Sequence, residues 1–131
     1  EFCRIPEGAL GGEPWSRSAQ GSGFLGADYL LSPPGLGGAV AGWVFRVETD
    51  GPHEVSARWP RREGLARNAP YTIAHADGIA VVRADQSARG GEWVPLGTWR
   101  FRRGFNHSVS LGDFAGGAVA ADAIRVAPAA P

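Results

Sequence analysis

Apolar and polar residues alternate over much of this chain, and turn-forming residues interrupt the alternation at short intervals. In residues 40–47 one face carries Ala41, Trp43, Phe45 and Val47. A period of two places successive side chains on opposite sides of an extended chain, so the pattern predicts strands with one buried face. Turn signals such as Asp50-Gly51-Pro52 favour tight connections between antiparallel neighbours.

The alternation predicts about eight strands. They cover residues 24–32, 40–47, 53–60, 71–75, 79–85, 93–101, 107–111 and 118–126. Leu96 falls out of phase within its strand, which predicts a β-bulge near Gly97. We find no helical period of useful length. Antiparallel strands with alternating faces are typical of a β-sandwich, and we expect an all-β jelly roll.

The length of 131 residues favours one domain, and 20 Gly with 10 Pro suit a turn-rich β protein. We expect an irregular segment or linker over 1–14, one jelly-roll module over 15–126 and a frayed tail over 127–131. The chain contains no Met, which indicates a piece of a longer protein. Cys3, the only cysteine, is either a free thiol on a frayed end or a partner for a missing part of the parent protein.

The charges balance, because thirteen cations, all of them Arg, meet thirteen anions. A nucleic-acid or membrane-surface binder carries a basic excess, so the balance argues against nucleic acid and membrane as partners. No apolar run approaches the roughly 20 residues that a membrane-spanning helix needs.

Catalytic motifs are sparse. His75 and Asp85 could face each other across the predicted hairpin, and a His–Asp pair near a serine can form the catalytic triad of a hydrolase. However, no Gly-x-Ser-x-Gly elbow is present, and His75 shares the predicted inward face of Tyr71 and Ile73. We therefore expect a core histidine and a protein that is not an enzyme, with a small hydrolase as the alternative.

Asp122 is in phase with Ile124, which directs its carboxylate inward. A buried carboxylate needs hydrogen bonds or a cation. Asp122 therefore either accepts bonds from loop backbone amides or helps to hold Ca²⁺, which takes several oxygen ligands. Because no acidic run of the EF-hand type is present, we expect backbone capping and no required metal or cofactor.

Residues 67–125 contain several motifs in a recognisable order. They are Arg67-Asn68-Ala69-Pro70-Tyr71-Thr72-Ile73, His75-Ala76-Asp77-Gly78, Gly90-Gly91-Glu92-Trp93 and Ala121-Asp122-Ala123-Ile124-Arg125. This order and spacing resembles the golvesin/xanthan-lyase carbohydrate-binding-like domain, and the resemblance extends more loosely over 15–126. The resemblance implies a galactose-binding-like jelly roll that serves as a non-catalytic accessory module of a secreted or cell-surface bacterial protein. Ser87-Ala88-Arg89 depart from the family, whose members tend to carry more amide side chains there.

Sugar binding needs flat apolar side chains flanked by planar polar groups. Trp43, Trp59 and Trp93 have inward parity and are predicted core residues. Other aromatic residues lie in the irregular first part of the chain or after the predicted bulge. The candidates for stacking on a sugar are therefore Trp15, Tyr29 and Trp99.

Arginines gather in two regions of the sequence. One region holds Arg58, Arg61, Arg62 and Arg67, and the other holds Arg100, Arg102 and Arg103. Guanidinium groups bind carboxylates through paired hydrogen bonds, so an anionic polysaccharide suits these clusters, whereas ordinary solvated arginines are the alternative. We add Arg58, Arg67 and Asn68 to the candidate ligand-binding residues, although Asn68 also suits a turn.

The sequence thus predicts a carbohydrate-binding module. Its partners would be a polysaccharide or cell-surface glycan and another domain of its parent protein. The alternative is a protein–protein or interdomain docking module, which would show a broad exposed apolar patch and bind no sugar.

Overall fold

The computed structural model describes residues 2–4, 15–26, 29–35 and 40–129. Within these ranges every regular element is a strand. The strands are β1 (Phe2–Arg4), β2 (Ser16–Ser18), β3 (Tyr29–Ser32), β4 (Val40–Val47), β5 (Gly51–Arg58), β6 (Ala69–His75), β7 (Gly78–Ala84), β8 (Val94–Phe101), β9 (Gly104–Gly112), β10 (Val119–Ala121) and β11 (Ala123–Pro128). Nowhere in this part of the chain is there a helix with the length and apolar character needed to cross a membrane.

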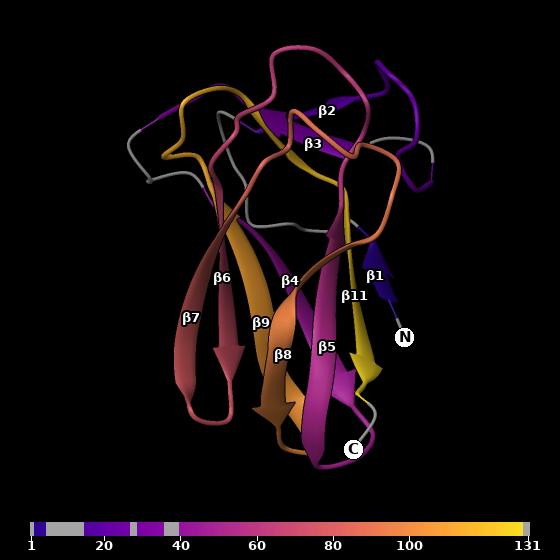
Figure 1. Ribbon diagram of the computed structural model, residues 1–131, viewed down its shortest axis with the longest axis vertical. Helices are drawn as coiled ribbons and strands as arrows, with labels where there is room; N and C mark the ends of the chain where they lie inside the picture. The colour runs from indigo at the N-terminus through magenta and orange to yellow at the C-terminus, as the bar shows by residue number, and fades with distance from the viewer. Residues whose placement is uncertain (1, 5–14, 27–28, 36–39, 130–131) are drawn as a thin grey trace.

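The strands pair in three sheets (Figure 1). Two four-stranded sheets have the orders β1-β11-β5-β8 and β4-β9-β6-β7, and their strands pair antiparallel. A three-stranded sheet, β10-β3-β2, lies beyond one end of the two larger sheets. The predicted all-β, antiparallel β-sandwich is confirmed.

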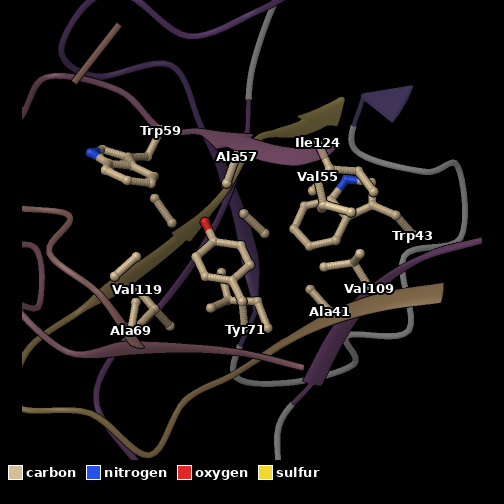
Figure 2. Close-up of a cluster of buried hydrophobic side chains, with 14 of the residues drawn as sticks. Ala41, Trp43, Val55, Ala57, Trp59, Ala69, Tyr71, Val109, Val119 and Ile124 are labelled. Atoms are coloured by element: carbon tan, nitrogen blue, oxygen red, sulfur yellow. The ribbon is translucent and has the colours of Figure 1, made fainter. Parts of the chain in front are cut away.

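The core lies between the two larger sheets, where their apolar faces meet (Figure 2). Trp43 on β4 stacks against Tyr71 on β6, with ring centroids 6.4 Å apart. Trp43 and Trp59 are both 1% exposed, which confirms them as core residues. Burying a large apolar side chain contributes on the order of 2–3 kcal/mol, so the alternate residues of these strands hold the sheets together.

Two short strands form where no strand was predicted. β1 pairs with β11, with Cys3 opposite Ile124, so the backbone at Cys3 belongs to a sheet rather than to a frayed end. β2 pairs with β3, which occupies only the second half of the strand predicted over 24–32. A strand of three residues is too short for its alternation to stand out in a sequence.

The strand predicted over 118–126 forms as two strands, because Asp122 interrupts it. β10 pairs with β3, whereas β11 pairs with β5 in the larger sheet. β11 then continues to Pro128, into the segment expected to be a frayed tail. The amide of Ala129 donates to the carbonyl of Pro52 at 2.9 Å, which extends the contact by one more residue.

The predicted bulge in β8 is confirmed. Val55 pairs with Gly97 and Ser56 pairs with Pro95, which leaves Leu96 as the extra residue. The indole of Trp99 lies against Gly97, where an added Cβ would come within 2.6 Å of the ring. Gly97 is therefore needed for the close approach of Trp99.

A buried glutamine ties the 85–93 loop to two sheets. Gln86 is 2% exposed, and its Nε2 donates to the hydroxyl of Tyr71 at 3.0 Å and to the carbonyl of Ala120 at 2.9 Å. Its Oε1 accepts the amide of Ala120 at 2.9 Å. Burial raises the pKa of the Tyr71 hydroxyl far above its usual value, so this hydroxyl stays protonated. One side chain thus satisfies three buried polar groups on β6 and β10.

Replacing Gln86 should therefore destabilise the fold strongly. Gln86→Ala leaves three buried polar groups without their partner, and we expect a loss of about 3 kcal/mol in the free energy of unfolding. Chemical denaturation measures this loss. Gln20→Ala is the matched control, because Gln20 is exposed and should cost less than about 0.5 kcal/mol. Equal effects of the two substitutions would contradict the structural role of Gln86.

Candidate functional site

Four loops gather at the end of the sandwich that carries the small sheet, at the top of Figure 1. They are residues 19–26, 59–68, 85–93 and 113–118, and we call this region the loop end. Backbone hydrogen bonds join neighbouring loops, such as the bond from the amide of Gln86 to the carbonyl of Ala66 at 2.8 Å. The loop end is therefore a connected surface built on the sheets below it.

A polar hollow of about 330 Å³ opens between the 59–68 and 85–93 loops. Its lining includes Arg61, Arg62, Ser87, Arg89 and Glu92. Three guanidinium groups against one carboxylate give the hollow a positive charge. Such a group of rigid, always charged donors suits carboxylates and neighbouring hydroxyl groups on a ligand.

Arg61 and Arg62 are fixed by the loops around them. Arg61 Nη1 donates to the carbonyl of Gly90 at 2.8 Å. Its guanidinium packs against Gly91, where an added Cβ would come within 2.5 Å of Nη1. Arg62 Nη1 donates to the hydroxyl of Tyr29 at 2.8 Å. These two arginines hold the walls of the hollow in place as well as lining it.

Arg89 differs from the other two arginines in its backbone. Its φ of 59° is left-handed, and no other non-glycine residue in the described ranges has a positive φ. This conformation costs an L-residue on the order of 1–2 kcal/mol and is most often retained at binding sites and switch regions. Its Nη2 lies 3.6 Å from Glu92 Oε1, and both side chains are about half exposed. A solvent-exposed ion pair contributes little to stability, so Arg89 is the arginine most available to a ligand.

Two of the aromatic residues predicted to stack on a sugar are buried instead. Trp15 is 7% exposed and Tyr29 is 0% exposed, and both belong to the hydrophobic core. Tyr29 lies on β3, and its hydroxyl donates to the carbonyl of Gln20 at 2.8 Å. The small sheet, which the sequence did not reveal, packs these rings inward, so the prediction that they stack on a ligand is corrected.

Trp99, the third predicted stacking residue, does not lie at the loop end. It is half-buried and stacks on His75, with ring centroids 6.0 Å apart and planes 21° apart. Trp93 was predicted to be a core residue but is also half-buried, and it lies just before the edge strand β8. Instead of filling the core, its ring lies under the guanidinium of Arg58 at 5.6 Å.

The predicted pair of His75 and Asp85 does not form. In the β6–β7 hairpin His75 pairs with Gly78, at the turn, whereas Ala84 at the other end pairs with Ala69. Asp85 follows Ala84 and therefore lies about 20 Å along the hairpin from His75. His75 Nδ1 instead accepts the amide of Asp77 at 3.2 Å.

Asp122 points inward, as predicted, and is fully buried. Its two oxygens accept the amide of Leu25 at 2.9 and 3.2 Å, so it caps the backbone of the 19–26 loop. Burial raises its pKa to about 7, against the opposing effects of the Leu25 bond and the positive charge of Arg58. Arg58 is held in place by a bond from Nε to the carbonyl of Gly23 at 3.0 Å.

In the ranges that the structure covers, no three His, Cys, Asp or Glu residues come together in a way that could hold a metal ion.

Arg67 and Asn68 line a second, shallower hollow of about 560 Å³, together with Gly116 and Gly117. Asn68 Oδ1 accepts the amide of Gly116 at 2.8 Å, so its side chain ties two loops together. Phe114, in the same loop as Gly116, is 58% exposed. The structure thus brings Arg67 and Asn68 together and separates them from Trp99.

Sequence reasoning missed Arg89, Glu92 and Phe114. Their positions in loops have no periodicity from which exposure could be inferred. The departure from the family pattern at Ser87-Ala88-Arg89 weighed against a ligand contact from this loop, so it gave no signal that Arg89 would line the hollow.

The raised pKa of Asp122 predicts a specific pH dependence of stability. The folded protein holds the proton of Asp122 more tightly than the unfolded chain, in which the pKa of the aspartate is 3.8. The contribution of Asp122 is therefore most favourable below about pH 4, falls as the pH rises towards 7 and is constant above that value. Between these two pH values the contribution of Asp122 to the free energy of unfolding changes by about 4 kcal/mol.

Denaturation of the wild type and of Asp122→Asn between pH 4 and pH 8 measures this contribution as a difference. The wild type should lose stability relative to the variant as the pH rises. Asp77→Asn, in the exposed turn of the β6–β7 hairpin, should keep the wild-type profile. Parallel profiles for the wild type and Asp122→Asn would contradict the assignment.

Comparison with known proteins places the chain among larger relatives. Xanthan lyase from Bacillus sp. (strain GL1) is 28% identical over 116 residues, which are 85% of this chain and 12% of that protein. The chain thus spans about an eighth of the length of this relative.

Solved structures share the fold. A Paenibacillus xanthan lyase matches with a TM-score of 0.88 and 24% identity, over 98% of this chain and 13% of that chain. The CBM35 from Cellvibrio japonicus matches with a TM-score of 0.70 and 16% identity, over 99% of this chain and 95% of that one. The CBM35 from Paenibacillus barcinonensis matches with a TM-score of 0.67 and 13% identity, over 98% and 99%. These similarities confirm the predicted jelly roll.

The predicted family is confirmed as well. A model of the Golvesin C-terminal domain matches residues 8–128, which is nearly the whole chain. The chain belongs to the Golvesin C-terminal domain family.

Proposed function

We propose that this chain is a non-catalytic, carbohydrate-binding accessory module of a larger secreted protein, and that its ligand binds in the polar hollow around Arg89. Its similarity in fold to two CBM35 structures supports the class of function. A relative named xanthan lyase, about eight times longer, supports an accessory role beside a polysaccharide-degrading domain. The observation that carries the site is the left-handed, half-exposed Arg89, which lines the same hollow as two arginines fixed by hydrogen bonds.

The size of the hollow suits part of a polysaccharide. Ligand sites in proteins have volumes of roughly 300–1,000 Å³, and this hollow, at about 330 Å³, lies at the lower limit. We infer that it takes a terminal or branch sugar rather than a long stretch of chain. The walls are preorganised because Arg61 and Arg62 already make hydrogen bonds to the protein.

The charge of the hollow favours a sugar with a carboxylate. Arg61, Arg62 and Arg89 outnumber Glu92, and a guanidinium can bind a carboxylate through two parallel hydrogen bonds. A ligand carboxylate would compete with Glu92 for Arg89, whose ion pair is long and exposed. An anionic polysaccharide that carries uronate or pyruvate groups has the required chemistry.

The hollow offers little apolar surface, since its lining contains no aromatic ring. Recognition then depends on charged hydrogen bonds, and we expect weak, salt-sensitive binding at a single site. Attachment to a longer protein that engages the same polysaccharide would raise the effective affinity.

Arg89→Gly is the sharpest test of this site. Glycine adopts a positive φ without strain, so this substitution removes the guanidinium and leaves the loop conformation intact. Loss of a charged hydrogen bond should weaken binding to acidic glycans by about tenfold or more. A glycan array, followed by calorimetry on the best ligand at two salt concentrations, measures the effect.

Arg100→Ala is the matched control, because Arg100 is an exposed arginine near the opposite end of β8. It should leave binding unchanged. If Arg100→Ala abolishes binding and Arg89→Gly does not, the site lies at the other arginine cluster. If the wild type binds no glycan, the carbohydrate-binding function itself is overturned.

Interdomain or protein–protein docking is the second candidate function. Four large apolar side chains on the strands β4 and β7 of one sheet are exposed, namely Val40, Val44, Ile79 and Val81, at 37%, 71%, 71% and 59%. Exposed apolar side chains on one face mark many protein contact surfaces. This observation favours docking if no glycan is bound.

A further inference from the structure

Among the strands that the structure describes, β7 has a free edge with little protection against pairing. β7 ends the order β4-β9-β6-β7, and its ladder with β6 runs over seven residues without a register shift. β8 is an edge strand of the other large sheet. It carries Pro95 and the bulge at Leu96, and both features commonly prevent pairing with a further strand. β4, at the far edge of the sheet that contains β7, lies beside β1.

β7 is also apolar on both faces. Ile79 and Val81 point outward and are 71% and 59% exposed, whereas Ala80 and Val82 point inward. Arg83 is the only charged residue of the strand. A long, regular and apolar edge strand is a template for pairing with another strand.

The hairpin register shows which backbone groups are free. Two residues form the turn between His75 and Gly78, so this flanking pair exchanges hydrogen bonds. Bonded and non-bonded pairs then alternate along the ladder. The amides and carbonyls of Ile79, Val81 and Arg83 therefore point away from β6, towards the free edge.

We infer that β7 pairs with β7 of a second copy of this chain, in an antiparallel arrangement about a two-fold axis at Val81. In this register Val81 meets the partner's Val81, and Ile79 meets the partner's Arg83. The three residues with free backbone groups on each copy then pair with the same three on the other copy. Three pairs with two bonds each give on the order of six backbone hydrogen bonds.

The side chains and charges are compatible with this pairing. Outward residues meet outward residues, so the faces of the two sheets continue across the axis. The two Arg83 side chains are separated by about 13 Å along the strands, which exceeds the screening length of about 8 Å in physiological salt. The net charge of zero gives no general repulsion between copies.

A second strand would also cover an apolar groove. This groove, of about 360 Å³, lies between β7 and β8 and has Val82, Val94 and Leu96 in its lining. A strand hydrogen-bonded to β7 would lie about 4.8 Å from it, across the mouth of the groove. Because one edge-to-edge pairing buries less than the roughly 800 Å² per partner of stable interfaces, we expect a weak dimer. The pairing does not depend on glycan binding, but this groove also has Arg89 in its lining and therefore adjoins the proposed glycan site.

Sedimentation velocity of the whole chain, from roughly 1 to 500 µM, tests the inference. We expect a concentration-dependent dimer. Val81→Lys places two like charges opposite each other at the axis and should weaken dimerisation about tenfold or more, and Val81→Glu should do the same. An equimolar mixture of the two variants should form the dimer again, because Lys and Glu then meet across the axis.

Val44→Lys is the matched control, since Val44 is also an exposed valine of the same sheet but lies on β4. It should leave dimerisation unchanged. A monomeric wild type over the whole range, or no recovery in the mixture, overturns the inference. A monomer whose Val81 amide is protected from hydrogen exchange only when another protein is added would point to a foreign strand as the occupant. Loss of the dimer with Val44→Lys would point to the outer sheet face instead.

Discussion

The buried amide of Gln86 connects the sheets of this fold to the loop end. Its bonds to Tyr71 and Ala120 join β6, β10 and the beginning of the 85–93 loop. Because these bonds lie in the core, where water cannot replace them, the loop cannot move without exposing unpaired polar groups. The position of Arg89, three residues later, therefore depends on an interaction with no direct part in ligand binding.

The loop end shows how a surface without regular strands can still be rigid. Arg62 bonds the hydroxyl of Tyr29, Asp122 accepts the amide of Leu25, and Asn68 accepts the amide of Gly116. Each bond connects segments that are far apart in the sequence. Most of the polar side chains predicted to bind a ligand are used in this way, and Arg89 is left with only an exposed ion pair. Arg89, the arginine most available to a ligand, is thus a residue that the sequence pattern did not single out.

The sequence predicted most of the strands of the large sheets, because apolar and polar residues must alternate along a strand with one buried face. It also predicted the bulge at Leu96, since an extra residue shifts the phase. The small sheet was not predictable, because its strands are only three or four residues long, and with it the burial of Trp15 and Tyr29 was missed. Asp122 was placed inward correctly, but residues 119–124 are all buried, so no alternation of burial marks the change of sheet at this residue. The left-handed backbone of Arg89 depends on loop closure, which no pattern of side chains records.

The glycines around Arg61 make the 19–26 and 85–93 loops depend on each other sterically. Gly91 has room for no side chain while Arg61 is present, and an added Cβ at Gly23 would come within 2.7 Å of Gly91. Gly90 lies against the main chain of Arg61, so shortening that side chain would not relieve it. A side chain at Gly23 therefore cannot be accepted unless the 85–93 loop changes as well. Diversification of the loop end in evolution should proceed by exchanging these two loops together, as one unit.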